Sequence, residues 1–225
     1  MSVRPRAAVF DLDGTLIDSL GLTFIAMREA VRPFLGRDLT DEEIYARFGP
    51  ADHEIVAGLV APNDADRAVR RLMAAYERGM ERMPLFPGIE PLLDTLADQG
   101  VVLAICTGRG RPSTDLIMRS LRLNRWFEVS VTGEEVARPK PWPDGILETL
   151  RRLELGPSEV LYVGDSVKDV EAGLAAGTLA AAARWGSLET NEAGFARAAL
   201  QARHPRDILA WWERNGSERD PEVLE

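Results

Sequence analysis

Hydrophobic residues along the chain gather in short unbroken runs rather than in alternating polar and apolar positions. Five runs rich in Val, Ile, Leu and Ala occupy residues 7–10, 101–106, 129–131, 160–163 and 179–183. Near-continuous hydrophobicity over so few residues is typical of parallel strands that helices cover on both faces. The pattern therefore predicts five buried parallel strands.

Segments with the helical spacing of apolar residues separate the later runs. They occupy residues 89–96, 116–123 and 146–153, and the last ends just before Gly156-Pro157. Strands that alternate with helices through short loops are the pattern of a doubly wound α/β fold. We therefore expect a Rossmann-like core built on a parallel sheet.

The alternation is interrupted once, between the first and second predicted strands. Residues 16–99 are too many for one crossover connection, and they contain no convincing strand. Helical patterns occur in this stretch at residues 20–34, 41–47 and 66–83. We therefore predict an all-helical cap, residues 16–84, inserted into a catalytic core formed by residues 1–15 and 85–225.

Composition and charge exclude several classes of function. A formal net charge of −9 and a pI near 4.9 argue against nucleic-acid binding, which needs clustered Lys and Arg. No apolar run reaches the length of a signal peptide or a membrane span. The single cysteine, Cys106, excludes an intramolecular disulfide and is compatible with a reducing compartment. We expect a cytoplasmic protein with no nucleic-acid or membrane partner, and the sequence leaves its oligomeric state open.

Two pairs of carboxylates follow predicted strands. Asp11 and Asp13 come directly after the first strand, and residues two apart in extended backbone share a side. Asp165 and Asp169 follow the fourth strand, and residues four apart share one side of a helix. Like charges held close together cost free energy unless a cation compensates. The alternative is a structural one, in which these acids form a turn or cap a helix.

Three further residues are expected at the same edge of the sheet. Thr107 and Gly108 follow the second strand, and their hydroxyl and amide groups can donate to an oxyanion. Lys140 follows the third strand in a loop whose prolines restrict its position. Each also has a structural interpretation, as a helix cap or as a solvated lysine. Ligands of doubly wound folds bind outside the carboxyl ends of the strands, so the whole set favours a common site.

Taken in chain order, the motifs that contain these residues resemble those of the haloacid dehalogenase superfamily, and most closely its phosphoglycolate phosphatase-like branch. The motifs are Asp11-Leu12-Asp13-Gly14-Thr15, Thr107, Lys140 and Gly164-Asp165 with Asp169. The helical insertion after the first motif is similar to the cap of that family. The resemblance implies a Mg²⁺-dependent phosphatase that hydrolyses a small phosphate monoester through an aspartyl-phosphate intermediate.

The resemblance also implies a role for each motif residue. Asp11 would be the nucleophile, and Asp13 would protonate the leaving oxygen and later deprotonate the attacking water. Thr107 and Gly108 would hydrogen-bond the phosphoryl oxygens. Lys140 would neutralise charge between Asp11 and the phosphate. A protein with a net negative charge needs such a local positive charge to accept an anion.

The implied metal ligands are oxygen atoms, in keeping with the preference of Mg²⁺ for hard donors. They are the carboxylates of Asp11 and Asp165 and the main-chain carbonyl of Asp13. For Asp169 two roles stay open, because it could orient a metal-bound water or Lys140, or bind the metal directly.

Substrate choice is expected to lie in the cap. Arg47 and His53, in the segment of residues 47–54, could bind an anion or a hydroxyl. For His53 the alternative is a capping or solvated position on a cap helix. Arg109, directly beyond the Thr107 motif, is a third candidate.

The sequence favours a phosphatase over several other functions. An acid at Asp13 disfavours the dehalogenases and phosphonate-cleaving relatives, which lack one there. Receiver signalling domains lack a helical insertion after the acidic strand. A phosphosugar mutase stays an alternative, although mutases typically carry a histidine that residues 19–23 lack. An inorganic pyrophosphatase and a non-catalytic phosphate-binding regulatory protein also stay open, and so does the identity of the phosphorylated metabolite.

Overall fold

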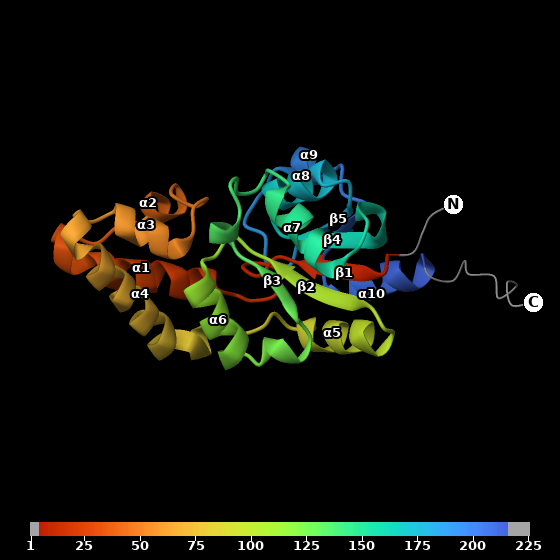
Figure 1. The fold of residues 1–225 in the computed structure, drawn as a ribbon, viewed down its shortest axis with the longest axis horizontal. Helices are drawn as coiled ribbons and strands as arrows, with labels where there is room; N and C mark the ends of the chain where they lie inside the picture. Colours follow the sequence, from red (N-terminus) through yellow and green to blue (C-terminus); the bar gives the residue numbers. More distant parts are fainter. Residues whose placement is uncertain (1–4, 216–225) are drawn as a thin grey trace, which may run out of the picture.

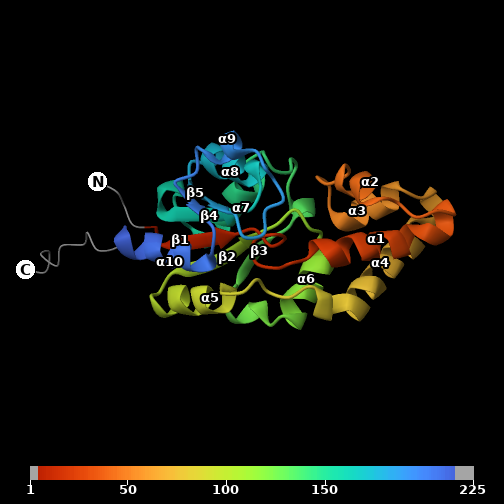
Figure 2. The same cartoon turned by 180° about the vertical axis from the view of Figure 1, so that it is seen from behind.

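A computed structural model describes residues 5–215 and is built around one six-stranded sheet (Figures 1 and 2). The strands are β1 (Ala7–Phe10), β2 (Val102–Cys106), β3 (Val129–Val131), β4 (Val160–Gly164), β5 (Leu179–Ala183) and β6 (Leu200–Ala202). Their order is β3-β2-β1-β4-β5-β6, and all neighbours are parallel. The predicted doubly wound α/β fold and its five strands are confirmed, and β6 is an addition.

Helices cover both faces of this sheet, as Figure 1 shows. One face carries α5 (Ile89–Asp98), α6 (Arg111–Ser120) and α10 (Pro205–Arg214), and the other carries α7 (Asp144–Leu153), α8 (Val167–Ala175) and the short α9 (Glu192–Phe195). Along β1, Ala8 and Phe10 pack in one hydrophobic cluster while Ala7 and Val9 pack in the other. Burial on both faces explains why the strands appear in the sequence as unbroken apolar runs.

A helical insertion separates β1 from α5 (Figure 1). It consists of α1 (Leu20–Leu35), α2 (Asp41–Tyr45), α3 (Asp52–Gly58) and α4 (Ala65–Gly79), with the short 3₁₀ helices Pro62–Asp64 and Met80–Arg82. Helices α1 and α4 pack through buried residues such as Met27 and Leu72. The division into a cap of residues 16–84 and a core stays a proposal. Its predicted core ranges extend into residues 1–4 and 216–225, outside the described part of the chain.

The two connections between the insertion and the sheet run side by side. The amide of Asp18 donates to the carbonyl of Pro84 at 2.9 Å, and that of Phe86 donates to Leu16 at 3.0 Å. This pairing ties the first acidic motif, which ends at Thr15, to the point where the chain returns to the core.

Several helix boundaries differ from the predicted ones. Helix α6 begins at Arg111 rather than at residue 116, because Pro112 is accommodated in the first turn of a helix, where no N–H donor is needed. Helix α3 is not predicted from the sequence at all. The remaining short 3₁₀ helices are Leu123–Arg125, Gly133–Glu135 and Pro157–Glu159. Between residues 5 and 215 no helix has the length and apolar character that crossing a membrane requires.

Candidate active site

Asp11 lies at the carboxyl end of the central strand β1. Its amide donates to the carbonyl of Val163 on β4 at 2.8 Å, which extends the strand pairing to the motif. The residue is only 7% exposed. The ammonium group of Lys140 donates to Asp11 Oδ1 and to Asp169 Oδ1, at 2.7 Å in each case. Residues 129 positions apart therefore meet at one sheet edge, as the motif pattern predicts.

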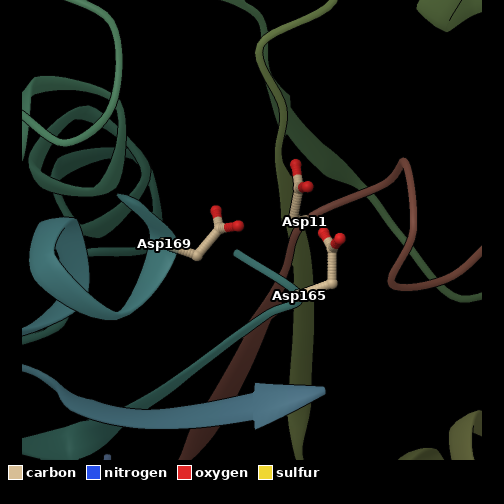
Figure 3. Close-up of side chains that lie close together, drawn as sticks. All are labelled: Asp11, Asp165 and Asp169. Carbon is tan, nitrogen blue, oxygen red and sulfur yellow. The ribbon is translucent and has the colours of Figure 1, made fainter. Parts of the chain in front are cut away.

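Three carboxylates form a compact cluster at this edge (Figure 3). One oxygen each of Asp11, Asp165 and Asp169 lies within 4.8 Å of the others. Figure 3 shows Asp11 and Asp165 side by side at the ends of neighbouring strands, with Asp169 facing them from α8. Hard carboxylate oxygens at this spacing are a donor set suited to a divalent cation such as Mg²⁺.

The charges of this cluster are not balanced within the protein. Burial, reinforced by the carboxylates of Asp169 and Asp13, raises the pKa of Asp11 to about 7 even though Lys140 opposes the shift. Burial and the neighbouring carboxylates of Asp169 and Asp11 raise the pKa of Asp165 well above its ordinary value. One lysine therefore faces three acids, and an additional positive charge would relieve their repulsion.

Asp169 is the most completely satisfied member of the cluster. Besides Lys140, it accepts from the hydroxyl of Tyr162 at 3.0 Å, and Oδ2 accepts from the hydroxyl and the amide of Ser166 at 2.5 and 3.1 Å. Ser166 is the N-cap of α8 and accepts in turn from the Asp169 amide at 3.2 Å. Burial alone would raise the pKa of Asp169, but Lys140 and Ser166 lower it. The helix cap that the sequence offers as an alternative is present, and it orients this carboxylate.

Gly14 is required where the first motif approaches Asp165. Its φ is +73°, a left-handed conformation that a side chain disfavours. A Cβ atom at this position would lie 2.4 Å from Asp165 Oδ2. The tight turn therefore brings the β1 motif and the β4 motif together, and Thr15 adds a 3.4 Å contact from its hydroxyl to Asp165 Oδ1.

Asp13 points toward a different partner. Arg109 holds its carboxylate in a two-point contact, with Nε 2.8 Å from Oδ2 and Nη2 2.7 Å from Oδ1. The hydroxyl of Ser19 also donates to Oδ1. A planar guanidinium that binds both carboxylate oxygens fixes orientation as well as charge. Asp13 is therefore held beside the cluster while its side chain stays about one-third exposed.

The same arginine joins the sheet edge to the helical insertion. Arg109 is 5% exposed, and it also donates to Thr23 Oγ1 on α1 at 2.8 Å and to Asp52 Oδ2 on α3 at 3.2 Å. Its guanidinium carbon lies 5.0 Å from the centre of the Tyr76 ring. Burial alone would raise the pKa of Asp52, but His53 and Arg109 lower it to about 2. The sequence does not predict Asp52 or Thr23 as site residues.

A cavity of about 510 Å³ opens between the sheet edge and the insertion. The predicted site residues that line it are Asp11, Asp13, Gly108, Arg109, Lys140, Asp165 and Asp169. Thr107 is buried at the end of β2, and its hydroxyl accepts from the Arg109 amide at 3.2 Å. Thr107 itself is absent from the cavity lining, so its predicted contact with phosphoryl oxygens stays a prediction.

Arg47 and His53 lie away from the cavity lining. The guanidinium of Arg47 donates to the carbonyl of Glu43. His53 Nε2 is 3.1 Å from Glu134 Oε2, across the contact between α3 and the core. Their predicted roles in substrate binding stay predictions.

The His53 contact has an expected pH dependence. The Asp52 carboxylate, 3.9 Å from His53 Nδ1, raises the pKa of His53 above its ordinary value of 6.5. Partial burial lowers the pKa, whereas Glu134 and Glu54 raise it further. The ion pairs of protonated His53 therefore contribute fully to stability below pH 6.5, and this contribution is lost as the pH rises through the raised pKa of His53. His53→Gln is expected to cost up to about 1 kcal/mol of unfolding free energy at pH 6 and less at pH 9, measured in urea. A cost independent of pH would contradict this, and Glu134→Gln should show part of the same dependence.

Comparison with known proteins identifies the family. The family model for haloacid dehalogenase-like hydrolases matches residues 8–183, so the chain belongs to this family. The matched region includes every acidic motif residue of the cluster. The chain is therefore a hydrolase of this superfamily, as the motif resemblance predicts.

Individual relatives define the branch more closely. The chain is 30% identical over 215 residues to N-acetylmuramic acid 6-phosphate phosphatase of Pseudomonas aeruginosa, covering 92% of this chain and 94% of the relative. It is 30% identical to phosphoglycolate phosphatase of Synechococcus elongatus, covering 80% and 84% respectively. A predicted phosphoglycolate phosphatase from Haemophilus somnus shares the fold, with a TM-score of 0.79, 19% identity, and coverage of 94% and 99%. The predicted likeness to phosphoglycolate phosphatases and the predicted class, phosphoric monoester hydrolase, are confirmed.

Proposed function

We propose that the protein is a Mg²⁺-dependent phosphatase that hydrolyses a small phosphorylated metabolite of the cytoplasm through an aspartyl-phosphate intermediate. The observation that carries this proposal is the 2.7 Å contact between Lys140 Nζ and Asp11 Oδ1, beside a three-carboxylate cluster at the base of a cavity. Such a site offers a nucleophile, a fixed positive charge and donors for a divalent cation together.

The chemistry proceeds in two steps at Asp11. A carboxylate oxygen of Asp11 attacks phosphorus, the bond from phosphorus to the ester oxygen breaks, and Asp13 gives its proton to the departing alkoxide. In the second step Asp13 takes a proton from water, the hydroxyl oxygen attacks phosphorus, and phosphate leaves Asp11. Lys140, Thr107 and the Gly108 amide balance the charge of the phosphoryl oxygens.

The donor set suits Mg²⁺, and the carboxylates of Asp11 and Asp165 would hold it together with the carbonyl of Asp13. When bound, it would neutralise the charge of the carboxylates and the phosphoryl group. Because Asp169 already accepts from Lys140, Tyr162 and Ser166, its proposed role is to orient Lys140 rather than to bind the metal.

The insertion is proposed to act as a cap through Arg109. This one buried side chain contacts Asp13 at the sheet edge and Asp52 on α3, so the position of the proton-transferring group depends on where the insertion sits. Ser19 adds a second donor to Asp13 from the start of α1. An arrangement of this kind couples closure over a substrate to the orientation of the acid.

Magnesium is expected to stabilise the protein as well as to activate it. Addition of Mg²⁺ to chelator-treated protein should raise the melting temperature by a few degrees, because it relieves repulsion among three neighbouring acids, and phosphate release in chelator should fall to less than about a tenth. Asp165→Asn should lose most of the thermal shift, whereas Asp66→Asn, which changes an exposed acid on α4, should keep it. Equal shifts in the two variants would contradict the proposed ligand set.

The products of the same assay separate the remaining functions. Release of inorganic phosphate from monoesters supports the phosphatase, whereas conversion of a sugar phosphate into an isomer without phosphate release indicates a mutase. Cleavage of pyrophosphate alone indicates a pyrophosphatase. Phosphate binding without any turnover would leave a regulatory phosphate-binding protein.

A further inference from the structure

Apolar side chains from two segments form part of the cavity wall. The insertion contributes Met27, Tyr45, Phe48 and Ile55 to it, and the loop after β5 contributes Trp185 and Leu188. A substrate whose phosphoryl group reaches Asp11 would therefore place the rest of the molecule among hydrocarbon and aromatic groups.

The aromatic side chains of this wall pack against neighbouring rings of the insertion. The Phe48 ring stacks on Phe24 with centroids 6.2 Å apart, and the Tyr45 ring lies 5.4 Å from Phe48. Tyr45 is nevertheless 47% exposed, and Leu188, in the loop after β5, is 65% exposed. Among the described residues few large apolar side chains are so exposed, and two of them line this one cavity. An apolar ligand between them would remove that surface from water.

Two of the three positive charges in the cavity are already paired with acids. Three cationic side chains line the cavity within the described chain, namely Lys140, Arg109 and Lys168. Lys140 is paired with Asp11 and Asp169, and Arg109 is paired with Asp13 and Asp52. Lys168, on the first turn of α8, is exposed and has no ion-pair partner among the described residues, so it is the one unpaired cation of the described lining.

The insertion supplies no cation to the described part of the cavity lining. The lining residue Asp52 is an acid whose pKa stays low, and Arg47 is turned toward the Glu43 carbonyl outside the lining. A second anionic group held against the insertion would therefore lose water without gaining a cation, because the unpaired Lys168 belongs to α8.

We propose that the enzyme prefers a phosphate monoester whose leaving group is uncharged and apolar, with an alkyl or aryl chain long enough to contact Phe48 and Leu188. This inference rests on the proposed phosphatase function, and it names the substrate class of the same site. It disfavours substrates with a second anionic group, such as phosphoglycolate and pyrophosphate, even though phosphoglycolate phosphatases are among the relatives of this chain.

Matched alkyl phosphates test the inference, because their leaving alcohols are all primary. In Mg²⁺, kcat/KM for hexyl phosphate should exceed that for ethyl phosphate by at least about tenfold, because the added methylenes enter an apolar pocket. Hexyl phosphate should exceed 6-phosphohexanoate, the same chain with a terminal carboxylate, by a similar factor. An equal or higher kcat/KM for ethyl phosphate, 6-phosphohexanoate or phosphoglycolate would overturn the inference.

Two phenylalanines of the insertion provide a matched pair of variants. Phe48→Ala should lower the ratio of kcat/KM for hexyl phosphate to that for ethyl phosphate by at least about fivefold. Phe34→Ala changes an equally half-buried ring of the insertion that is absent from the cavity lining, and it should keep the ratio within twofold. An unchanged ratio in Phe48→Ala would contradict the proposal that Phe48 contacts the alkyl chain of the substrate.

Binding distinguishes failure of this inference from failure of the phosphatase proposal. Hexylphosphonate, which cannot be hydrolysed, should bind at least about tenfold more tightly than ethylphosphonate by calorimetry in Mg²⁺. Tighter binding without hydrolysis of any ester would support the apolar site and refute the phosphatase. Hydrolysis of phosphoglycolate in preference to hexyl phosphate would support the phosphatase and refute the apolar site.

Discussion

Asp11→Asn is expected to lower kcat for phosphate release by about 10⁴-fold or more, with the fold unchanged. A carboxamide is a poor nucleophile, so the variant cannot form the aspartyl phosphate, while its shape still fits beside Lys140. The comparison needs initial rates on the best monoester with saturating Mg²⁺, and circular dichroism to confirm that the variant is folded. Mass spectrometry of rapidly quenched wild-type protein should find a phosphoryl group on the peptide that contains Asp11.

The matched control for this variant is Asp115→Asn on α6. Asp115 is an exposed acid whose partner is Arg111, and it is absent from the cavity lining. It should retain full activity and the phosphorylated peptide. If Asp11→Asn kept more than a tenth of the wild-type rate, hydrolysis would have to proceed without the covalent intermediate, and the proposed role of Asp11 would be wrong.

The sheet could be predicted because its strands are buried on both faces. All four residues of β1 are fully buried, so this strand is an unbroken apolar run in the sequence. In β6, by contrast, Gln201 is exposed between Leu200 and Ala202, and three such residues give no pattern. Helix α3 was equally difficult to predict, because it begins at Asp52, only two residues after Gly49-Pro50, and this dipeptide predicts a turn.

The carboxylate cluster could be predicted because parallel strands deliver their carboxyl ends to one edge. Asp11 and Asp165 converge for that reason, and Lys140 reaches them from the loop after β3. The contact between Arg109 and Asp52 could not be predicted, because it depends on how the insertion docks against the core. One sequence signal indicates a role for Tyr162, because it places a hydroxyl group within an otherwise aliphatic strand. A buried hydroxyl needs a hydrogen-bond partner, and in the structure that partner is Asp169.

Arg109→Met is expected to cost about 3–5 kcal/mol of unfolding free energy, the cost of removing one partner from a buried ion pair. The variant leaves Asp52, only 6% exposed, without the guanidinium that lies 3.2 Å from its Oδ2. It also removes the two-point contact to Asp13. Urea unfolding at neutral pH, analysed as a two-state transition, measures the loss.

A double variant shows whether the buried charge is the cause. Asp52→Asn replaces the stranded carboxylate with a neutral amide, so Arg109→Met/Asp52→Asn should be more stable than Arg109→Met alone. Arg125→Met, which breaks an exposed pair with Glu90 at 2.6 Å, should cost less than about 1 kcal/mol. If Arg109→Met cost no more than Arg125→Met, Arg109 would not join the insertion to the sheet edge. The coupling proposed between the insertion and Asp13 would then fail, because no other single side chain described here contacts both Asp13 and Asp52.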